Sequence, residues 1–202
     1  MKKSTLSTLR ILLILTLLML ISLAVIFSLR PQAINSSNSS TLGGDFTLQS
    51  SQGPVSLSDY RGKVVALYIG YASCPDVCPT ALAVITQAFK SLETEEKLQV
   101  AGLFISVDPD RDTPEKLATY TRFFSPMITG LTADKASLDK VVRQYGAFYR
   151  KVEMEDSAMG YAVDHSSRIY LIDTAGKLYK PLLHNSSPVQ LMTEIRTLLN
   201  QS

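Results

Sequence analysis

The stretch KVVALYIGYASCPDVCPTAL, residues 63–82, joins two hydrophobic patterns and decides the fold. Residues 63–70 carry a continuous apolar run rich in β-branched side chains, which is typical of a central strand covered on both faces. Further along the chain, apolar residues recur at helical spacing at Ala81, Leu82, Ile85, Phe89 and Leu92. Cys74 and Cys78, the only cysteines in the sequence, therefore lie at a predicted strand-to-helix junction.

The two cysteines lie four positions apart, and each is followed by a proline. Proline disfavours the α conformation of the residue before it, so we expect both thiols outside regular helix or in its first turn. A disulfide that closes so short a loop removes little entropy from the unfolded chain, which argues against a stapling role. Thiols at a helix N-terminus ionise readily, and thiolates serve both redox cycling and metal binding. The pattern by itself leaves both chemistries open.

Two hairpins are predicted on either side of the cysteine junction. Residues 45–60 alternate apolar and polar side chains around a Gly53-Pro54 turn. Residues 168–180 form a second hairpin that turns at residues 173–176.

One more buried strand and three more helices complete the prediction. The strand covers residues 98–107, and the helix after it has Thr113 as N-cap and Pro114 at its first position. The next helix carries an apolar face made of Leu138, Val141, Val142, Tyr145 and Phe148. The last helix starts at Ser187-Pro188 and turns inward Leu191, Ile195, Leu198 and Leu199. This order of elements predicts an α/β fold, a thioredoxin-like sandwich.

Composition limits the class of protein. The chain has 202 residues, of which 46% are hydrophobic, enough for one ordinary domain with a buried core. It has 20 basic and 18 acidic residues and no basic run of the kind that marks a nucleic-acid surface. We therefore expect no nucleic-acid partner.

The amino-terminal region has the pattern of a membrane anchor. Residues 11–29 carry no charge, and a helix of about 19 residues can cross a hydrocarbon core of about 30 Å. The apolar run is longer than that of a cleavable signal, so residues 1–30 are predicted to remain as a transmembrane anchor. Residues 31–44 form a polar, flexible linker, and residues 45–202 form the thioredoxin-like domain.

Charge around the apolar run predicts the side of the membrane on which the domain lies. Lys2, Lys3 and Arg10 precede the run, which places the amino terminus in the cytoplasm and the domain outside it. The start lacks an Arg/Ser-rich transit segment, which favours a bacterial inner membrane with the domain facing the periplasm or cell exterior. The thiols would then need a reductant, because that compartment is oxidising.

Three motifs, in a fixed order along the chain, give the sequence a specific resemblance to a known family. They are CPDVCPTAL (residues 74–82), SVDPDRDTPEKL (residues 106–117) and VDHSSRIYLID (residues 163–173). Together they resemble the Sco/SenC family, the membrane-anchored, thioredoxin-like copper chaperones of cytochrome c oxidase assembly. The resemblance implies that Cys74, Cys78 and His165 bind copper. It also implies a copper donor, a thiol reductant, and an acceptor that is a cytochrome c oxidase subunit or another cuproprotein.

Ligand chemistry agrees with copper as the metal. Thiolates suit Cu(I), imidazole suits both Cu(I) and Cu(II), and a set of only three ligands leaves a position open for transfer. The competing function is that of a thiol-disulfide reductase that uses Cys74 and Cys78 as a redox disulfide and maintains the copper-site cysteines of the oxidase. Thioredoxin-like reductases usually have a CxxC spacing and a cis-proline facing the disulfide. Here the spacing is CxxxC, and Ser167 stands at the proline position.

The alternating carboxylates Asp108, Asp110 and Asp112 resemble the start of a calcium loop. An EF-hand loop also needs glycine at its sixth position and glutamate at its twelfth, where this chain has Thr113 and Thr119. We interpret the segment instead as an exposed turn and helix cap.

Three further features lie near the predicted ligand or share its chemistry. Asp164 could orient the imidazole of His165 as its sequence neighbour. Met154 and Met159, in the segment before His165, could offer thioether contacts to copper in transit, although methionine more often packs. His184 fits no motif and is interpreted as a surface residue.

Overall fold

The structure is a computed structural model that describes residues 14–20, 22, 42–155, 157 and 159–201. The chain divides into two compact units, Met1–Thr41 and Leu42–Ser202. In the first unit, residues 14–20 and 22 are helical and exposed. No helix among the described residues is long and apolar enough to cross a bilayer. Most of the predicted span at residues 11–29, and most of the predicted linker, lie outside the described residues.

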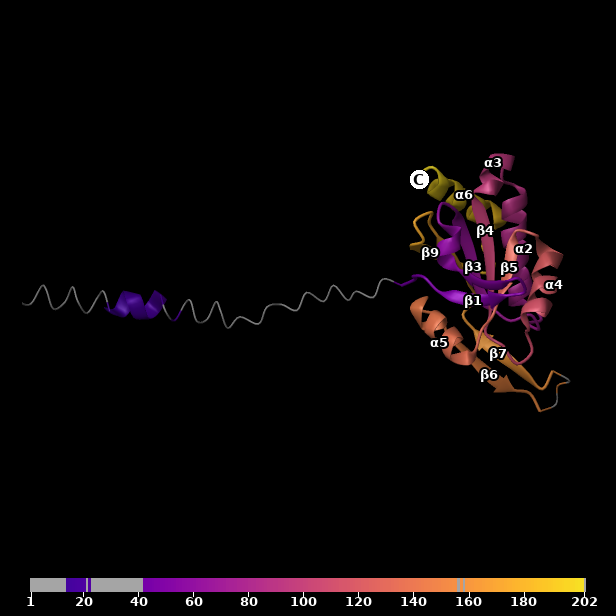
Figure 1. Ribbon diagram of the computed structural model, residues 1–202, viewed down its shortest axis with the longest axis horizontal. Helices are drawn as coiled ribbons and strands as arrows, with labels where there is room; N and C mark the ends of the chain where they lie inside the picture. The colour runs from indigo at the N-terminus through magenta and orange to yellow at the C-terminus, as the bar shows by residue number, and fades with distance from the viewer. Residues whose placement is uncertain (1–13, 21, 23–41, 156, 158, 202) are drawn as a thin grey trace, which may run out of the picture. The chain divides into compact units, whose positions relative to one another are not determined.

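A five-stranded sheet with strand order β5-β4-β3-β8-β9 forms the centre of the second unit (Figure 1). Its strands are β3 (Val64–Gly70), β4 (Val100–Ser106), β5 (Ile128–Leu131), β8 (Arg168–Ile172) and β9 (Leu178–Leu183). Strands β3, β4 and β5 are parallel, whereas β8 is antiparallel to β3 and β9 is antiparallel to β8. Every residue of β3 and β4 is buried, as predicted from their apolar runs.

Helices accompany this sheet in the second unit. They are α2 (Val77–Lys90), α3 (Thr94–Leu98), α4 (Pro114–Phe124), α5 (Lys135–Gln144) and α6 (Pro188–Leu199). Helix α2 packs against α6, and α4 packs against β5. The largest fully buried side chains come from both layers and include Tyr68, Phe89, Phe104, Tyr145 and Tyr170.

The predicted helix starts are confirmed. Thr113 caps α4, since its hydroxyl accepts a hydrogen bond from the N–H of Lys116 at 3.3 Å, and Pro114 is the first helical residue. Ser187 caps α6 in the same way, accepting from the N–H of Gln190 at 3.1 Å. These caps satisfy donors that have no partner within the helix.

The first hairpin turns two residues earlier than predicted. Strands β1 (Thr47–Ser50) and β2 (Gly53–Ser56) are joined through residues 51 and 52, and a 3-10 helix η1 (Leu57–Tyr60) follows. The hydroxyl of Ser50 accepts a hydrogen bond from the N–H of Gln52 and donates one to the carbonyl of Gly53. These bonds close the turn before Gly53-Pro54, which therefore belong to β2.

Helix α5 is shorter than its predicted apolar face. Leu138, Val141 and Val142 are buried, but Phe148 lies beyond the helix and is 55% exposed. Gly146 has a φ of 61° and donates a hydrogen bond to the carbonyl of Arg143, which ends the helix with a left-handed residue.

A third hairpin lies in the segment that ends at His165, where no strand was predicted. It consists of β6 (Tyr149–Glu153) and β7 (Tyr161–His165), which pair in antiparallel register with Tyr149 opposite His165. In Figure 1 this hairpin lies beside α5, at the opposite end of the unit from α3. Its side chains do not alternate cleanly between buried and exposed, so no strand pattern marks it in the sequence. Strand β5 and helix α3 were also not predicted.

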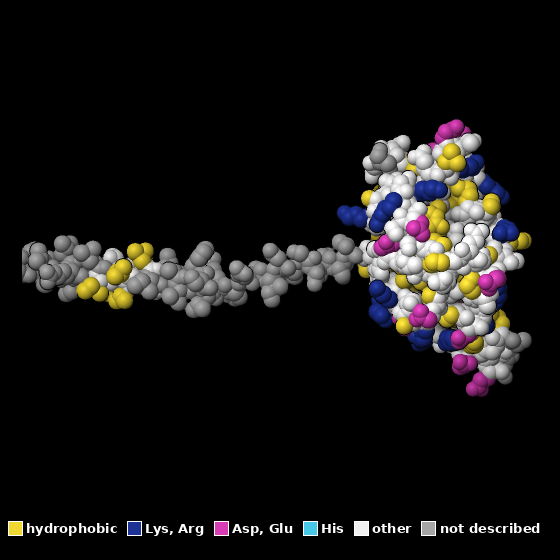
Figure 2. Space-filling model, viewed as in Figure 1, with side chains coloured by type: hydrophobic (Ala, Val, Ile, Leu, Met, Phe, Trp, Pro, Cys, Tyr) yellow, Lys and Arg dark blue, Asp and Glu magenta, His cyan; other side chains and the backbone are white. Residues whose placement is uncertain are grey.

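The surface of the unit mixes charges and isolated apolar side chains. On the face seen in Figure 2, basic and acidic side chains are interspersed over the domain. The most exposed large hydrophobic side chains of the domain are Phe123 (86%) and Leu98 (72%), which come from α4 and α3.

Candidate metal centre

Cys74, Cys78 and His165 meet at one point. Their ligand atoms all lie within 4.8 Å of one another, and the Sγ of Cys78 lies 3.3 Å from Nε2 of His165. Both cysteines are free and buried, whereas His165 is partly exposed. Within the described part of the chain this is the one cluster of three or more such side chains. The segment VDHSS thus lies beside SCPDVCP, as a shared ligand set of Cys74, Cys78 and His165 requires.

Three elements bring these side chains together. Strand β3 ends at Gly70, and Cys74 lies in the loop that follows, where its N–H donates to the carbonyl of Tyr71 at 3.3 Å. Cys78 is in the first turn of α2, where a proline such as Pro79 is tolerated. His165 is the last residue of β7. Neither cysteine lies in the interior of a regular helix, in agreement with the prolines that follow them.

The absence of a side chain at Gly70 makes room for the thiol of Cys78. A Cβ atom at position 70 would lie 2.5 Å from the Sγ of Cys78 and 3.0 Å from the ring of Tyr68. Real atoms do not approach so closely, so the end of β3 requires glycine if the thiol is to lie against the strand.

The two thiols differ in acidity. The hydrogen bond from the Cys78 thiol, assisted by His165 and by the backbone N–H of Asp76, holds the pKa of Cys74 well below its usual range. Burial, and the hydrogen bond and negative charge of Cys74, raise the pKa of Cys78. The pKa of Cys74 is thus lowered and that of Cys78 raised, so Cys74 is the thiol that ionises first.

Two tyrosines pack around the imidazole. The rings of Tyr71 and Tyr68 meet the ring of His165 edge to face, with centroids 5.7 and 6.1 Å away. The hydroxyl of Tyr68 donates to the carbonyl of Val77 at 3.4 Å, and burial raises the pKa of that hydroxyl. These aromatic walls restrict the imidazole on the side of the protein interior.

The carboxylate turn after β4 is not the exposed turn that the sequence indicated. Asp108 and Asp112 are fully buried, and only Asp110 projects into solvent. The carboxylate of Asp112 accepts hydrogen bonds from the N–H of Ala72 at 2.7 Å and from the hydroxyl of Ser106 at 2.6 Å. Buried carboxylates need such partners, and sequence alone did not show that the cysteine loop supplies one.

Asp164 does not orient the imidazole. Its carboxylate pairs with Arg150 at 2.8 Å on the exposed side of β7. The Nδ1 atom of His165 instead faces the carbonyl of Ser166 at 3.3 Å. Adjacent residues of a strand point to opposite faces, so the sequence neighbour of His165 faces away from it.

The remaining candidates lie outside the cluster. Met154 and Met159 are 40% and 36% exposed, near the turn between β6 and β7. His184 follows β9, is partly exposed, and is not part of the metal-binding cluster. Ser167 occupies the position expected for a cis-proline in a reductase, and there is no cis peptide bond among the described residues.

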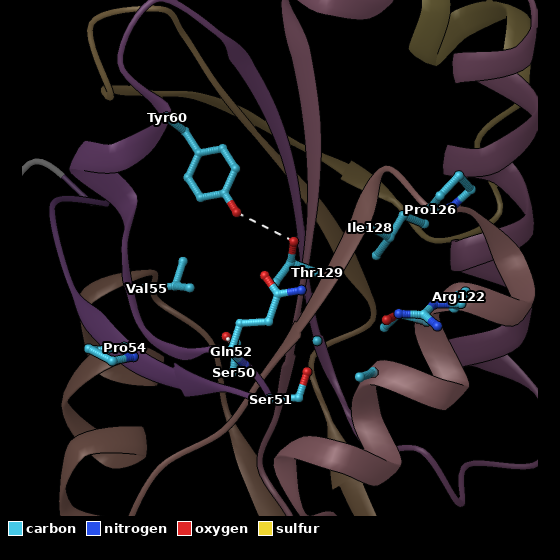
Figure 3. Close-up of a pocket in the computed structure, with 13 residues that line it drawn as sticks. Ser50, Ser51, Gln52, Pro54, Val55, Tyr60, Arg122, Pro126, Ile128 and Thr129 are labelled. Atoms are coloured by element: carbon cyan, nitrogen blue, oxygen red, sulfur yellow. Dashed lines mark hydrogen bonds between the residues drawn. The ribbon is translucent and has the colours of Figure 1, made fainter.

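A pocket of about 470 Å³ lies elsewhere, between the β1-β2 hairpin, β5 and α4 (Figure 3). Tyr60 points across it toward Thr129, whose hydroxyl lies 3.4 Å from the phenol oxygen. The lining contains no thiol or imidazole, so a soft metal ion finds no ligand there.

The cysteine-histidine cluster fits a single metal ion. Thiolate sulfur and imidazole nitrogen lie about 2.0–2.3 Å from a bound first-row metal such as zinc, so three donors in a trigonal arrangement lie about 3.5–4.0 Å apart. The three ligand atoms lie within 4.8 Å of one another, so binding of one ion requires them to approach by at most about 1 Å. Two sulfurs and one nitrogen form a soft donor set that excludes Mg²⁺ and Ca²⁺ as preferred metals.

Comparison with known proteins gives the family. The family model described as SCO1/SenC matches residues 34–200, which is most of the chain. The chain belongs to the SCO1/SenC family. It is 38% identical to a SCO2-like protein of Rickettsia conorii over 156 residues, covering 77% of this chain and 76% of that protein. It is also 36% identical to the mitochondrial SCO1 homolog of Homo sapiens over 161 residues, covering 77% of this chain and 52% of that protein.

Solved structures of the family confirm the thioredoxin-like α/β fold. ScoI of Bradyrhizobium japonicum with copper bound is 34% identical and superposes with a TM-score of 0.70, covering 78% of this chain and 99% of that chain. ScoI of Arabidopsis thaliana with copper bound is 33% identical, with a TM-score of 0.73, covering 80% and 99%.

Proposed function

We propose that this protein is a copper chaperone that binds copper through Cys74, Cys78 and His165 and delivers it to a cuproprotein. The observation that carries the proposal is the meeting of two free thiols and one imidazole within 4.8 Å. Copper-bound structures of family members support copper as the metal. The copper site of cytochrome c oxidase is the acceptor that we favour, because a related structure is described as a cytochrome c oxidase assembly protein.

The ligand set suits a carrier. The ionised Cys74 offers a ready thiolate, and Cys78 becomes the second when copper displaces its proton. Three protein ligands leave one coordination position open, and an acceptor thiolate can enter there before the carrier's ligands leave. His165 is the most exposed of the three and lies at the end of a two-stranded hairpin, so we expect it to detach first.

Two measurements distinguish a copper chaperone from a thiol-disulfide reductase, namely copper transfer to an acceptor and thiol exchange in the absence of metal. The full-length protein, reduced and loaded with Cu(I), is mixed with a reduced, copper-free acceptor domain that carries a dithiol copper site. We expect copper to move to the acceptor, and the variant His165→Ala to transfer poorly. A reduced protein that binds no copper by metal analysis would overturn the proposal.

The alternative function is reduction of the acceptor's disulfide, and the low pKa of Cys74 favours it. In that reaction the Cys74 thiolate attacks the acceptor disulfide and forms a mixed disulfide. Cys78 then loses its proton and attacks Cys74, which releases the acceptor dithiol and leaves a Cys74–Cys78 disulfide. A separate thiol reductant must restore the starting state. Reduction of the acceptor without copper, at an equal rate in His165→Ala, would establish this function instead.

We further propose that residues 1–30 anchor the domain to a bacterial inner membrane, with the domain outside the cytoplasm. The uncharged run at residues 11–29 and the basic residues before it support this orientation. Determination of the mature amino terminus tests the anchor. We expect the residues before position 31 to be retained, and a mature terminus near Ala33 would contradict the proposal.

A further inference from the structure

The turn between β4 and α4 contacts both segments that carry the candidate ligands. At its carboxyl-terminal end, Asp112 accepts the N–H of Ala72, two residues before Cys74. The ammonium group of Lys116 pairs with the other oxygen of Asp112 at 3.0 Å. This end of the turn therefore holds the cysteine loop.

Arg111, in the same turn, holds the hairpin that carries His165. Its Nη1 atom donates to the carbonyl oxygen of Tyr161 at 3.0 Å and to that of Met159 at 3.2 Å. Its guanidinium lies 3.7 Å from the centre of the Tyr161 ring, which is stacking distance. Arg111 therefore contacts Tyr161, the first residue of β7, at both its backbone carbonyl and its aromatic ring.

Asp108 stabilises the contact between Arg111 and Tyr161 by binding both side chains. Its fully buried carboxylate accepts the Nε–H of Arg111 at 2.5 Å on one oxygen and the hydroxyl of Tyr161 at 2.7 Å on the other. A buried carboxylate with two such partners holds them in one geometry. Asp108, Arg111 and Tyr161 thus form a closed triangle of contacts between the turn and β7.

The strand period connects this triangle to the imidazole. Tyr161, Val163 and His165 are alternate residues of β7 and share one face, which faces the domain, since Val163 is 4% exposed. His165 packs edge to face against the rings of Tyr68 and Tyr71, but its polar contacts are only the carbonyl of Ser166 and the thiol of Cys78, both at 3.3 Å. The two rings limit the imidazole on one side, and the position of β7 determines whether it reaches the thiols.

We propose that Arg111 is a positioning residue for His165, acting through Tyr161 to hold β7 so that the imidazole meets the two thiols. The inference rests on the proposed copper function, because it concerns the third ligand of that site. Arg111 touches no ligand atom and does not bind the metal. Arg111 also lies 5.7 Å from the ring centre of Tyr71 in the cysteine loop, but the hydrogen bond from Ala72 to Asp112 remains when Arg111 is lost, so both thiolates should stay in place.

A double-mutant cycle tests the proposal with the full-length protein. The affinity for Cu(II) is measured by competition for the wild type, Arg111→Ala, His165→Ala and the double variant. We expect Arg111→Ala to weaken Cu(II) binding about tenfold to a hundredfold, as is usual for residues that orient a ligand. In the His165→Ala background the same substitution should have no further effect. Equal weakening in both backgrounds, or unchanged affinity in Arg111→Ala, overturns the proposal.

Electron paramagnetic resonance of the Cu(II)-loaded proteins gives a readout that a general loss of stability does not move. Nitrogen coupling from the imidazole should disappear in His165→Ala and be weakened in Arg111→Ala. Wild-type nitrogen coupling in Arg111→Ala contradicts the inference. If Arg111→Ala does not fold, Arg111→Lys enters the same cycle, since lysine keeps the charge but not the planar fork that reaches two carbonyls.

Arg196→Ala is the matched control. Arg196 of α6 also makes a two-pronged contact, donating to the carboxylate of Glu96 in α3 at 2.7 and 3.0 Å, at the other end of the domain. This variant should bind Cu(II) like the wild type, and an equal loss from it overturns the assignment to Arg111. The proposed function fails separately, if the wild type binds no copper or if His165→Ala binds Cu(II) as tightly as the wild type.

Discussion

The Sγ of Cys78 lies 3.3 Å from Nε2 of His165, although 87 positions separate the two residues in the sequence. The thiol belongs to the first turn of α2 and the imidazole to the last residue of β7. Metal binding at this point therefore depends on how β7 docks on the domain, as well as on the cysteine motif. This dependence leads to predictions for the thiols, for the strand end beneath them, and for the turn beside them.

The first prediction concerns the two thiols of the metal-free, reduced protein. Because the pKa of Cys74 is lowered, its thiolate is already formed at pH 6, and its alkylation rate should be nearly constant from pH 6 to 8. An ordinary thiol with a pKa of about 8.5 speeds up nearly tenfold per pH unit over most of this range. Mass spectrometry after timed iodoacetamide treatment identifies the modified residue. Faster labelling of Cys78, which is fully buried, would refute the assignment of the charge.

Oxidation should abolish copper binding. A Cys74–Cys78 disulfide has no thiolate to donate, and the imidazole of His165 alone is a weak site. Copper retained after gel filtration is measured for the reduced and the oxidised protein. Unchanged affinity in a fully oxidised sample would show that the thiols are not ligands.

Gly70→Ala should disturb the candidate metal centre. The added methyl group would meet the Sγ of Cys78 at 2.5 Å, so the thiol or α2 must shift. Overpacking of this kind typically costs about 1–3 kcal/mol of stability. We expect weaker copper binding even in the folded fraction, measured by competition under conditions in which circular dichroism shows native structure.

Gly102→Ala is the matched control for that substitution. Its methyl group would meet Ile128 at 2.7 Å, between β4 and β5. It should lower stability without changing the copper affinity of the folded protein. Equal effects of both variants on copper affinity would show that the effect of Gly70→Ala is not local.

Asp112→Ala should destabilise the domain. It leaves the buried hydroxyl of Ser106 and the N–H of Ala72 without their acceptor, a loss of about 1–3 kcal/mol in the free energy of unfolding. Denaturant unfolding of the metal-free protein measures it. Asp110→Ala, in the same turn but exposed, should have little effect. A larger effect from Asp110→Ala would contradict the roles that we assign to these carboxylates.

The sequence predicted the elements whose pattern is local. The apolar runs of β3 and β4 and the caps at Thr113 and Ser187 are found as predicted, because each depends on a few adjacent residues. The β6-β7 hairpin was missed because Val163 is its only buried residue. A single buried residue gives no alternation of buried and exposed positions to detect in the sequence.

Only the residues of the candidate site that belong to recognisable motifs could be assigned their role from the sequence. The proximity of Cys74, Cys78 and His165 was expected from the resemblance and the fold. The burial of Asp108 and Asp112 was not, because their partners Tyr161 and Ala72 come from distant segments. A polar stretch with alternating carboxylates is predicted to be exposed, because its sequence does not show the long-range contacts that bury two of them.

The most direct test of the account is a copper titration of two single variants of the reduced, full-length protein, His165→Ala and His184→Ala. In His165→Ala two thiolates remain, so Cu(I) should still bind, whereas Cu(II), which prefers nitrogen ligands, should bind more weakly. His184 lies outside the cluster, and its replacement should change neither affinity. Equal losses from both variants, or a loss from His184→Ala alone, would contradict the assignment of Cys74, Cys78 and His165 as the metal centre.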